Sequence, residues 1–218
     1  MCLREAIEQH RDDKEVCRYT AKRRGSNLDM RRLTVLVDMD GTIAGFNNRI
    51  EVVWNELHPD KLAPTICQLT NWRTDEVYAS LHGDEASIVV RRIYQGPEFF
   101  NKLEPLPGAI DAIKEMAEEH DVFFCSSPVG SYLHCLHDKF AWIETHFGKA
   151  WTQKIILTHD KTLVRGDILI DDKPKITGML QPTWKHVYYT QAYNADLDGP
   201  RVTNWENWRV ALATVMAA

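Results

Sequence analysis

The sequence has no apolar stretch that approaches the length of a membrane span, and its first residues lack the apolar core of a secretory signal peptide. Its five cysteines are odd in number and include no Cys-x-x-Cys pair, which argues against a disulfide framework and favours a reducing compartment. These absences predict a cytoplasmic protein with no membrane partner.

The chain also lacks an excess of positive charge, because its formal net charge is −5. Long nucleic acids and anionic membranes are therefore poor partners for it. No internal repeat or low-complexity tract is present. A small anionic ligand held through a metal ion is still compatible with this charge.

At 218 residues and 44% hydrophobic content, the chain suits one globular domain with room for a small insertion. Residues 1–30 interleave acidic and basic side chains. An organelle-targeting peptide is poor in acidic residues, so this segment is better explained as a solvated helix or a charged extension.

Five short apolar runs predict β-strands, at 33–37, 121–126, 154–158, 167–170 and 186–190. They alternate with segments of helical periodicity, such as 133–147, which is the rhythm of a parallel, doubly wound α/β sheet. The segment 45–103 interrupts this rhythm with aromatic residues at helical spacing and predicts a small helical lid. The last helix is expected to begin at a capping box of Thr203 and Glu206.

Carboxylates follow two of these strands. Asp38 and Asp40 come after the first strand, and Asp171 and Asp172 come after the fourth. Taken alone, the first pair is equally consistent with a strand cap and a turn. Two such pairs at neighbouring strand ends repel one another unless a hard cation lies between them, and oxygen ligands favour Mg²⁺. The sequence therefore predicts a magnesium site at this edge of the sheet.

Such a site can transfer a phosphoryl group, which needs an in-line nucleophile, positive charge on the phosphoryl oxygens and a proton for the leaving alkoxide. Asp38 can attack phosphorus to give an aspartyl-phosphate. Asp40 can protonate the ester oxygen and afterwards take a proton from water. Ser126 offers a hydroxyl to a phosphate oxygen, and Lys161 supplies a fixed cation.

The order of these motifs resembles the haloacid-dehalogenase superfamily of phosphatases: Asp-x-Asp-Gly-Thr on a first strand, then Ser, then Lys, then Asp-Asp. Within that superfamily, longer segments are similar to the 5′(3′)-deoxyribonucleotidases, at 99–109, 125–128, 138–144, 157–162 and 169–174. The resemblance covers nearly everything from residue 33 to about 210. The segments Leu-Glu-Pro-Leu-Pro-Gly and Asp-Lys-x-Ala-Trp are specific to the deoxyribonucleotidase branch.

The resemblance implies a Mg²⁺-dependent phosphatase that hydrolyses deoxyribonucleoside monophosphates similar to dUMP and dTMP. It implies a haloacid-dehalogenase-like Rossmannoid core at 31–44 and 104–218, a helical cap at 45–103 inserted after the first strand, and a charged extension at 1–30. A nucleotide is the expected partner, and polymeric nucleic acid is not. Caps of this family can take part in dimer contacts, so a homodimer stays open.

The resemblance also assigns roles by position. Asp38 matches the nucleophile, and Asp40 matches the acid/base and a metal ligand through its backbone carbonyl. The metal candidates are Asp38, Asp40, Asp171 and Asp172, with Asp172 favoured over Asp171 as the direct ligand.

The substrate-binding candidates are Phe46, Trp72, Arg73, Ser127 and Lys139. Phe46 and Trp72 match an aromatic wall around the base and sugar, and an apolar wall disfavours a ribose 2′-hydroxyl. Asn71 and Arg73 stand where the family carries further apolar residues, so base preference stays open. Lys139 is compatible with a solvated helix flank, or with a structural or phosphate-side role.

Two other functions fit parts of the pattern. A haloacid-dehalogenase phosphatase for another small phosphomonoester, such as a sugar phosphate, would share the core, although an apolar lid suits a sugar poorly. A phospho-acceptor signalling domain also gathers Asp, Ser or Thr, and Lys around Mg²⁺. Such a domain needs neither a lid nor an acid two residues after its acceptor, so Asp40 and the insertion favour the enzyme.

Overall fold

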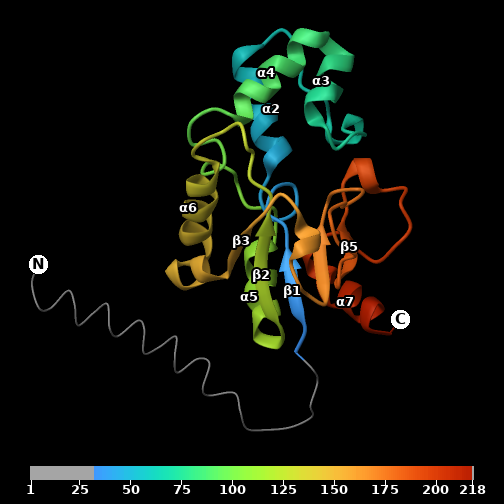
Figure 1. Ribbon diagram of the computed structural model, residues 1–218. Helices are drawn as coiled ribbons and strands as arrows, with labels where there is room; N and C mark the ends of the chain where they lie inside the picture. The colour runs from blue at the N-terminus through green and yellow to red at the C-terminus, as the bar shows by residue number, and fades with distance from the viewer. Residues whose placement is uncertain (1–31, 218) are drawn as a thin grey trace, which may run out of the picture. The chain divides into compact units, whose positions relative to one another are not determined.

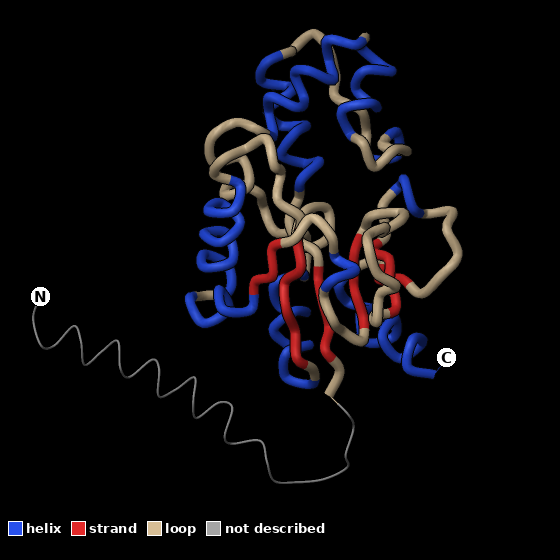
Figure 2. The backbone as a smooth tube through the Cα atoms, in the orientation of Figure 1, coloured by secondary structure: helices blue, strands red, loops and turns tan. Residues whose placement is uncertain are grey.

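The computed structural model describes residues 32–217, which fold around a six-stranded sheet (Figures 1 and 2). The strands are β1 (Thr34–Val37), β2 (Asp121–Ser126), β3 (Ile155–Leu157), β4 (Ile168–Asp171), β5 (Lys185–Tyr189) and β6 (Arg201–Val202). All neighbours pair in parallel, in the order β3-β2-β1-β4-β5-β6. The predicted parallel, doubly wound α/β sheet is therefore confirmed, while the predicted extension at 1–30 lies outside the described residues.

The central strands β1 and β4 are short apolar runs, Thr-Val-Leu-Val and Ile-Leu-Ile-Asp. Branched and apolar side chains fit a pleated surface that is covered on both faces. The chain runs from β1 outward to β2 and β3, then returns to the other side of β1 as β4. The strand order therefore reverses between β1 and β4, which is the place where open α/β sheets bind ligands.

The core helices pack on one face of the sheet. They are α5 (Ala109–Glu119), α6 (Cys135–Phe147) and α7 (Trp208–Ala217). Their buried side chains join Val35, Val37 and Phe124 in the main hydrophobic cluster. A smaller cluster around Leu36 and Trp184 occupies the opposite face.

Three helices form an insertion between β1 and α5: α2 (Phe46–Leu57), α3 (Thr74–His82) and α4 (Asp84–Tyr94). We refer to residues 46–94 as the helical insertion. Its aromatic residues largely form its own core, as in the contact of the Trp54 and Tyr78 rings, whose centroids lie 4.7 Å apart. Figure 1 shows these helices beyond the carboxyl-terminal ends of the strands.

Two details differ from the sequence-based expectation. The prediction of a capping box at Thr203 and Glu206 is wrong. Asn204 instead caps the 3₁₀ turn η5 (Trp205–Asn207), and its side chain accepts from the N–H groups of Glu206 and Asn207. An Asn carbonyl caps as well as a hydroxyl does. Strand β6 was not predicted, because two residues are too short to show a pattern. No helix within residues 32–217 is long and apolar enough to cross a membrane.

Trp142 anchors the point where the chain returns from the insertion to the core. Its side chain is fully buried, and its indole Nε1 donates to the Leu103 carbonyl at 2.6 Å. We expect Trp142→Phe to lower the free energy of unfolding by about 1–3 kcal/mol, because a buried carbonyl loses its partner. Urea denaturation measures this loss.

Trp151→Phe is the matched control. Trp151 lies in the neighbouring 3₁₀ turn η2 (Lys149–Lys154) and is partly exposed, and it packs on Phe124 and Phe147. We expect a smaller loss for this variant. Equal losses in the two variants would show that the Trp142 hydrogen bond contributes nothing.

Candidate active site

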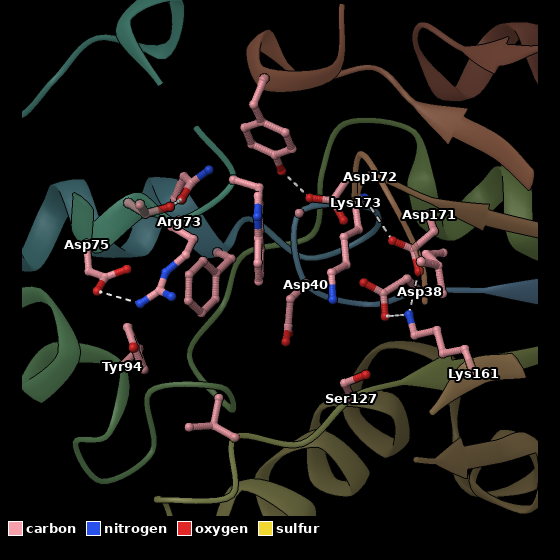
Figure 3. Close-up of a pocket in the computed structure, with 18 of the residues that line it drawn as sticks. Asp38, Asp40, Arg73, Asp75, Tyr94, Ser127, Lys161, Asp171, Asp172 and Lys173 are labelled. Carbon is pink, nitrogen blue, oxygen red and sulfur yellow. Dashed lines mark hydrogen bonds and ion pairs between the residues drawn. The ribbon is translucent and has the colours of Figure 1, made fainter. Parts of the chain in front are cut away.

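A cavity of about 360 Å³ opens between the carboxyl-terminal edge of the sheet and the helical insertion (Figure 3). Core residues at the cavity include Asp38, Asp40, Ser127, Lys161, Asp171 and Asp172. Residues of the insertion at the cavity include Phe46, Trp72, Arg73, Asp75 and Tyr94. The two groups face each other across the cavity, with four carboxylates on the side of the core and that of Asp75 on the side of the insertion (Figure 3).

Three carboxylates converge where the strand order reverses. Asp38 follows β1, Asp171 ends β4 and Asp172 follows it, and one oxygen of each lies within 4.8 Å of the other two. The sheet ladder fixes this convergence, because the Asp38 N–H donates to the Ile170 carbonyl at 2.9 Å. Three negative charges at this spacing repel one another.

The raised pKa of Asp172 shows that the cluster of three carboxylates has too little positive charge around it. Burial raises the pKa of Asp172 well above its ordinary value, and the charges of Asp171 and Asp38 raise it further. The Tyr193 hydroxyl donates to Asp172 Oδ2 and opposes that rise in pKa only in part. A divalent cation relieves such a cluster, and oxygen-only donors are those that Mg²⁺ prefers. The residues present therefore fit a bound Mg²⁺.

Lys161 supplies a fixed cation beside this cluster. Its Nζ donates to Asp38 Oδ1 at 2.6 Å and to Asp171 Oδ2 at 2.5 Å. Burial alone would lower the pKa of Lys161, but the charges of the two carboxylates outweigh burial and raise it above its ordinary value. Lys161 begins the 3₁₀ turn η3 (Lys161–Leu163), which Asp160 caps by accepting from the Thr162 N–H at 2.9 Å.

The two carboxylates of the late pair differ in their partners. Both oxygens of Asp171 are engaged, Oδ2 by the Lys161 ammonium and Oδ1 by the Lys173 N–H at 2.9 Å. The oxygens of Asp172 contact only neutral hydroxyls within the described residues, those of Tyr193 and Thr42. Asp172 is therefore the member of the pair whose charge is left for an ion.

Asp40 stands apart from the three-carboxylate cluster. Its Oδ2 accepts from Lys139 Nζ, whereas its Oδ1 is buried and has no hydrogen-bond partner in the part of the chain that is described. Burial raises the pKa of Asp40, the charge of Asp38 adds to this rise, and Lys139 opposes it. The free oxygen of a carboxyl group with a raised pKa is suited to carry a proton.

Ser126 and Lys139 lie behind the cavity surface. Ser126 ends β2, and its buried Oγ accepts from Lys139 Nζ at 2.9 Å. Lys139 is fully buried, with its Nζ 4.8 Å from the centroid of the Phe100 ring. The alternative of a solvated Lys139 is therefore wrong. The cavity surface includes Ser127, but neither Ser126 nor Lys139 reaches it within the described residues.

Aromatic residues of the insertion form the opposite wall. Phe46 begins α2 and packs against Tyr94 and Phe99, with ring centroids 5.7 Å and 5.4 Å apart. Trp72 is about half exposed, and Lys173 Nζ lies 4.7 Å from its ring centroid. The Lys173 side chain extends into the cavity from the core, so this contact joins the core to the insertion across the cavity (Figure 3).

The far end of the cavity is polar. Arg73 lies 3.5 Å from Asp75 Oδ2, and Arg91 approaches the same oxygen at 3.2 Å. Sequence reasoning identified Arg73 but missed Asp75, Lys173 and Tyr193. Lys173 could have been predicted, because it directly follows Asp171 and Asp172 in the sequence. Asp75 has the appearance of an ordinary acidic residue in the first turn of a helix.

A family model described as "5′ nucleotidase, deoxy (Pyrimidine), cytosolic type C protein" matches residues 31–216. The chain belongs to the 5′(3′)-deoxyribonucleotidase family. The human cytosolic-type 5′(3′)-deoxyribonucleotidase is 40% identical to this deoxyribonucleotidase over 190 residues, covering 84% of this chain and 94% of its own. The human mitochondrial 5′(3′)-deoxyribonucleotidase is 37% identical over 190 residues, covering 84% of this chain and 83% of its own.

Solved structures confirm the haloacid-dehalogenase-like fold of this deoxyribonucleotidase. The crystal structure of a predicted phosphatase from Clostridium acetobutylicum has a TM-score of 0.52 at 12% identity, covering 84% of this chain and 98% of its own. A haloacid dehalogenase-like hydrolase from Streptococcus pneumoniae has a TM-score of 0.50 at 11% identity, covering 83% and 98%. The protein is a phosphomonoester hydrolase of the nucleotidase type, as predicted.

Gly41 keeps the backbone close to Asp172. Its φ is +73°, and a Cβ there would collide with Asp172 Oδ2 and lie 3.1 Å from Asp172 Cγ. If Asp172 holds the ion as predicted, we expect Gly41→Ala to lower the deoxyribonucleotidase activity about 10- to 100-fold, the usual cost of disturbing the support of a metal ligand. Phosphate release as a function of Mg²⁺ concentration measures this loss.

Gly148→Ala is the matched control. Gly148 has a φ of +94°, and no atom of the described residues lies within 4 Å of the position that an alanine Cβ would take there. Both variants carry backbone strain of about 1–3 kcal/mol. Only Gly41→Ala also displaces Asp172. Equal activities in the two variants would contradict the role given to Gly41.

Proposed function

We propose that this deoxyribonucleotidase hydrolyses deoxyribonucleoside monophosphates such as dUMP and dTMP, with Mg²⁺ as cofactor and an aspartyl-phosphate on Asp38 as intermediate. One observation carries the proposal: oxygens of Asp38, Asp171 and Asp172 lie within 4.8 Å of one another. Lys161 neutralises only part of this charge, and a divalent ion together with a phosphate ester completes the balance.

The metal ligands in this proposal are the carboxylates of Asp38 and Asp172 and the backbone carbonyl of Asp40. Asp171 is a weaker candidate because Lys161 and the Lys173 N–H occupy both of its oxygens. When bound, Mg²⁺ supplies positive charge that draws the phosphoryl oxygens toward Asp38.

Asp38 acts as the nucleophile in the first step. Lys161 Nζ holds Asp38 Oδ1, which orients the carboxylate so that Oδ2 can attack phosphorus. The P–O bond to the sugar breaks as the Asp–O–P bond forms. Asp40 gives its proton to the leaving alkoxide, and Oδ1 is the atom that holds this proton, because Oδ2 accepts from Lys139.

Asp40 acts as the base in the second step. Its carboxylate, now without the proton, takes a proton from a water molecule that attacks phosphorus. The bond between phosphorus and Asp38 breaks, which releases inorganic phosphate and restores both carboxyl groups. Lys139 holds Asp40 in place in both steps.

The cavity surface supports the substrate class. We propose that the Ser127 hydroxyl donates to a phosphate oxygen, in the place predicted for Ser126, and that Lys139 acts through Asp40. Phe46 and Trp72 flank the sugar and base. Burial of a ribose 2′-hydroxyl in an apolar wall without a partner costs about 1–3 kcal/mol, which favours deoxyribose.

The proposal also covers the division of the chain into core and cap and the location of the protein. The core consists of 31–44 and 104–218. The cap over it consists of 45–103 and contains the three helices of the helical insertion. The protein acts in the cytoplasm, which the similarity to a human cytosolic-type relative supports.

Phosphate release from a panel of substrates tests the proposed function. With Mg²⁺ present, we expect dUMP and dTMP to be hydrolysed at least about fivefold faster than UMP, from the cost of a buried hydroxyl. Equal rates on UMP and dUMP would contradict the apolar sugar wall. Faster hydrolysis of glucose phosphate would support a phosphatase for other phosphomonoesters, and stoichiometric capture of phosphate without turnover would support a signalling domain.

A further inference from the structure

A second cavity, of about 520 Å³, lies on the helical insertion and shares no residue with the catalytic cavity. Helices α2 and α4 form its two sides. Its apolar wall consists of Val53, Leu57, Val89, Ile93 and Phe99. Gly96 and Pro97 also line it, together with the side chains of Arg49, His58 and Arg92. The cavity therefore combines an apolar wall with positive charge.

The two arginines of this cavity have no acidic partner among the described residues. Over residues 32–217, neither Arg49 nor Arg92 takes part in an ion pair or a side-chain hydrogen bond. Arg49 Nε is moreover buried and has no hydrogen-bond partner in the described part of the chain. A buried donor without a partner is costly, and native structures satisfy nearly all such groups. In a chain with a net charge of −5, a buried guanidinium nitrogen that has no partner within residues 32–217, beside a second, exposed arginine in the same cavity, indicates an anionic ligand.

A second copy of the chain is a poor occupant for this cavity. A twofold interface brings the same surface of both copies together. Arg49 and Arg92 of one copy would then approach the same arginines of the other, without acidic residues of the cavity lining to compensate them. A small anion avoids this repulsion, and a guanidinium group pairs well with phosphate or carboxylate oxygens.

The walls of the second cavity and the catalytic cavity are in contact. Phe99 lines the second cavity and meets Phe46 of the catalytic cavity edge to face, with ring centroids 5.4 Å apart. On α4, Ile93 lines the second cavity and the adjacent Tyr94 lines the catalytic one. A ligand that packs on Phe99 therefore contacts the wall behind Phe46.

We infer that this second cavity binds a small organic anion, a phosphate, phosphonate or carboxylate attached to an apolar or aromatic body. The anionic group pairs with Arg49 and Arg92, and the body packs on the wall that includes Phe99. The site is separate from the proposed nucleotidase chemistry and does not depend on it.

Titration of the full-length protein with phenylphosphonate in the presence of Mg²⁺, followed by the backbone amide NMR signals, tests this inference. Phenylphosphonate carries a dianionic head and an aromatic body, and its C–P bond is not a phosphate ester. We expect saturable shifts at 89–93, in the second cavity, and separate shifts at 171–173 if the catalytic cavity also binds the probe. The double variant Arg49→Gln/Arg92→Gln should bind the probe at 89–93 at least about tenfold more weakly.

Each outcome of this titration has a distinct meaning. Unchanged affinity at 89–93 in the double variant, or equal binding of neutral benzyl alcohol, would overturn recognition of an anion. Absence of shifts at 89–93 in the wild-type protein would overturn the site. Absence of shifts at 171–173 alone, in the wild-type protein, would show only that the catalytic cavity does not bind this phosphonate, and would leave this inference intact.

The double variant also needs a folding and assembly control. Because neither arginine has a partner to lose within residues 32–217, we expect its thermal unfolding to match that of the wild type. A change of the sedimentation coefficient from dimer to monomer in the variant would instead identify this face as an interface between copies and overturn the inference.

Discussion

Replacement of Asp38 by asparagine is expected to lower phosphate release from dUMP at saturating Mg²⁺ by at least about 10⁴-fold, in the range observed when an enzymatic nucleophile is removed. Asparagine keeps the shape of the side chain, but its amide is a far weaker nucleophile than a carboxylate. The change also removes one of the three charges that meet within 4.8 Å. Steady-state release of inorganic phosphate measures the effect.

Two controls separate the loss of the nucleophile from other effects. Asp111→Asn removes an exposed carboxylate on the first turn of α5 and should leave turnover unchanged. Raising the Mg²⁺ concentration should not rescue Asp38→Asn if attack on phosphorus is what is lost. Turnover of the Asp38→Asn variant near the wild-type rate would remove Asp38 as the nucleophile.

Asp40→Asn is expected to lower the steady-state hydrolysis of dUMP by about 10²- to 10⁴-fold, the usual worth of a positioned acid or base. The Oδ1 of Asp40 has no partner among the described residues and is therefore the atom placed to hold a proton, and an amide cannot exchange that proton. The nucleoside leaving group needs protonation, whereas p-nitrophenolate leaves without it.

The choice of leaving group tests the proton transfer directly. With p-nitrophenyl phosphate, the Asp40→Asn variant should release a burst of p-nitrophenol, about one per active site, followed by slow turnover, because only the second step still needs the base. With dUMP the variant should show no burst. Equal losses on both substrates with no burst would indicate that Asp40 only holds the structure together.

Much of the fold follows from local patterns. The runs at β1 and β4 are apolar on both faces, and such runs predict central parallel strands without reference to any distant residue. Asp38 and Asp171 then meet because the carboxyl ends of parallel strands share one edge of the sheet. The convergence of these carboxylates was therefore predictable from strand ends alone.

Other parts of the site depend on contacts between distant residues and were not predictable. Lys139 was compatible with the solvated flank of a helix, yet it is buried, and its Nζ donates directly to Asp40 and Ser126. Which of Ser126 and Ser127 faces the cavity depends on the exact end of β2, since successive side chains point to opposite faces. Tyr193 lies in a turn without periodicity, and only the folded chain brings it to Asp172.

Mass spectrometry of the acid-quenched enzyme can locate the phosphoryl group that we propose forms on Asp38. The protein is mixed with dUMP and Mg²⁺, quenched within one turnover and digested, and the site of any phosphoryl group is located. We expect a phosphoryl group on Asp38 in the wild-type protein, only in the presence of Mg²⁺, and none in Asp38→Asn. A phosphoryl group on another residue would rule out Asp38 as the nucleophile, and one that forms equally well without a divalent ion would rule out the need for Mg²⁺.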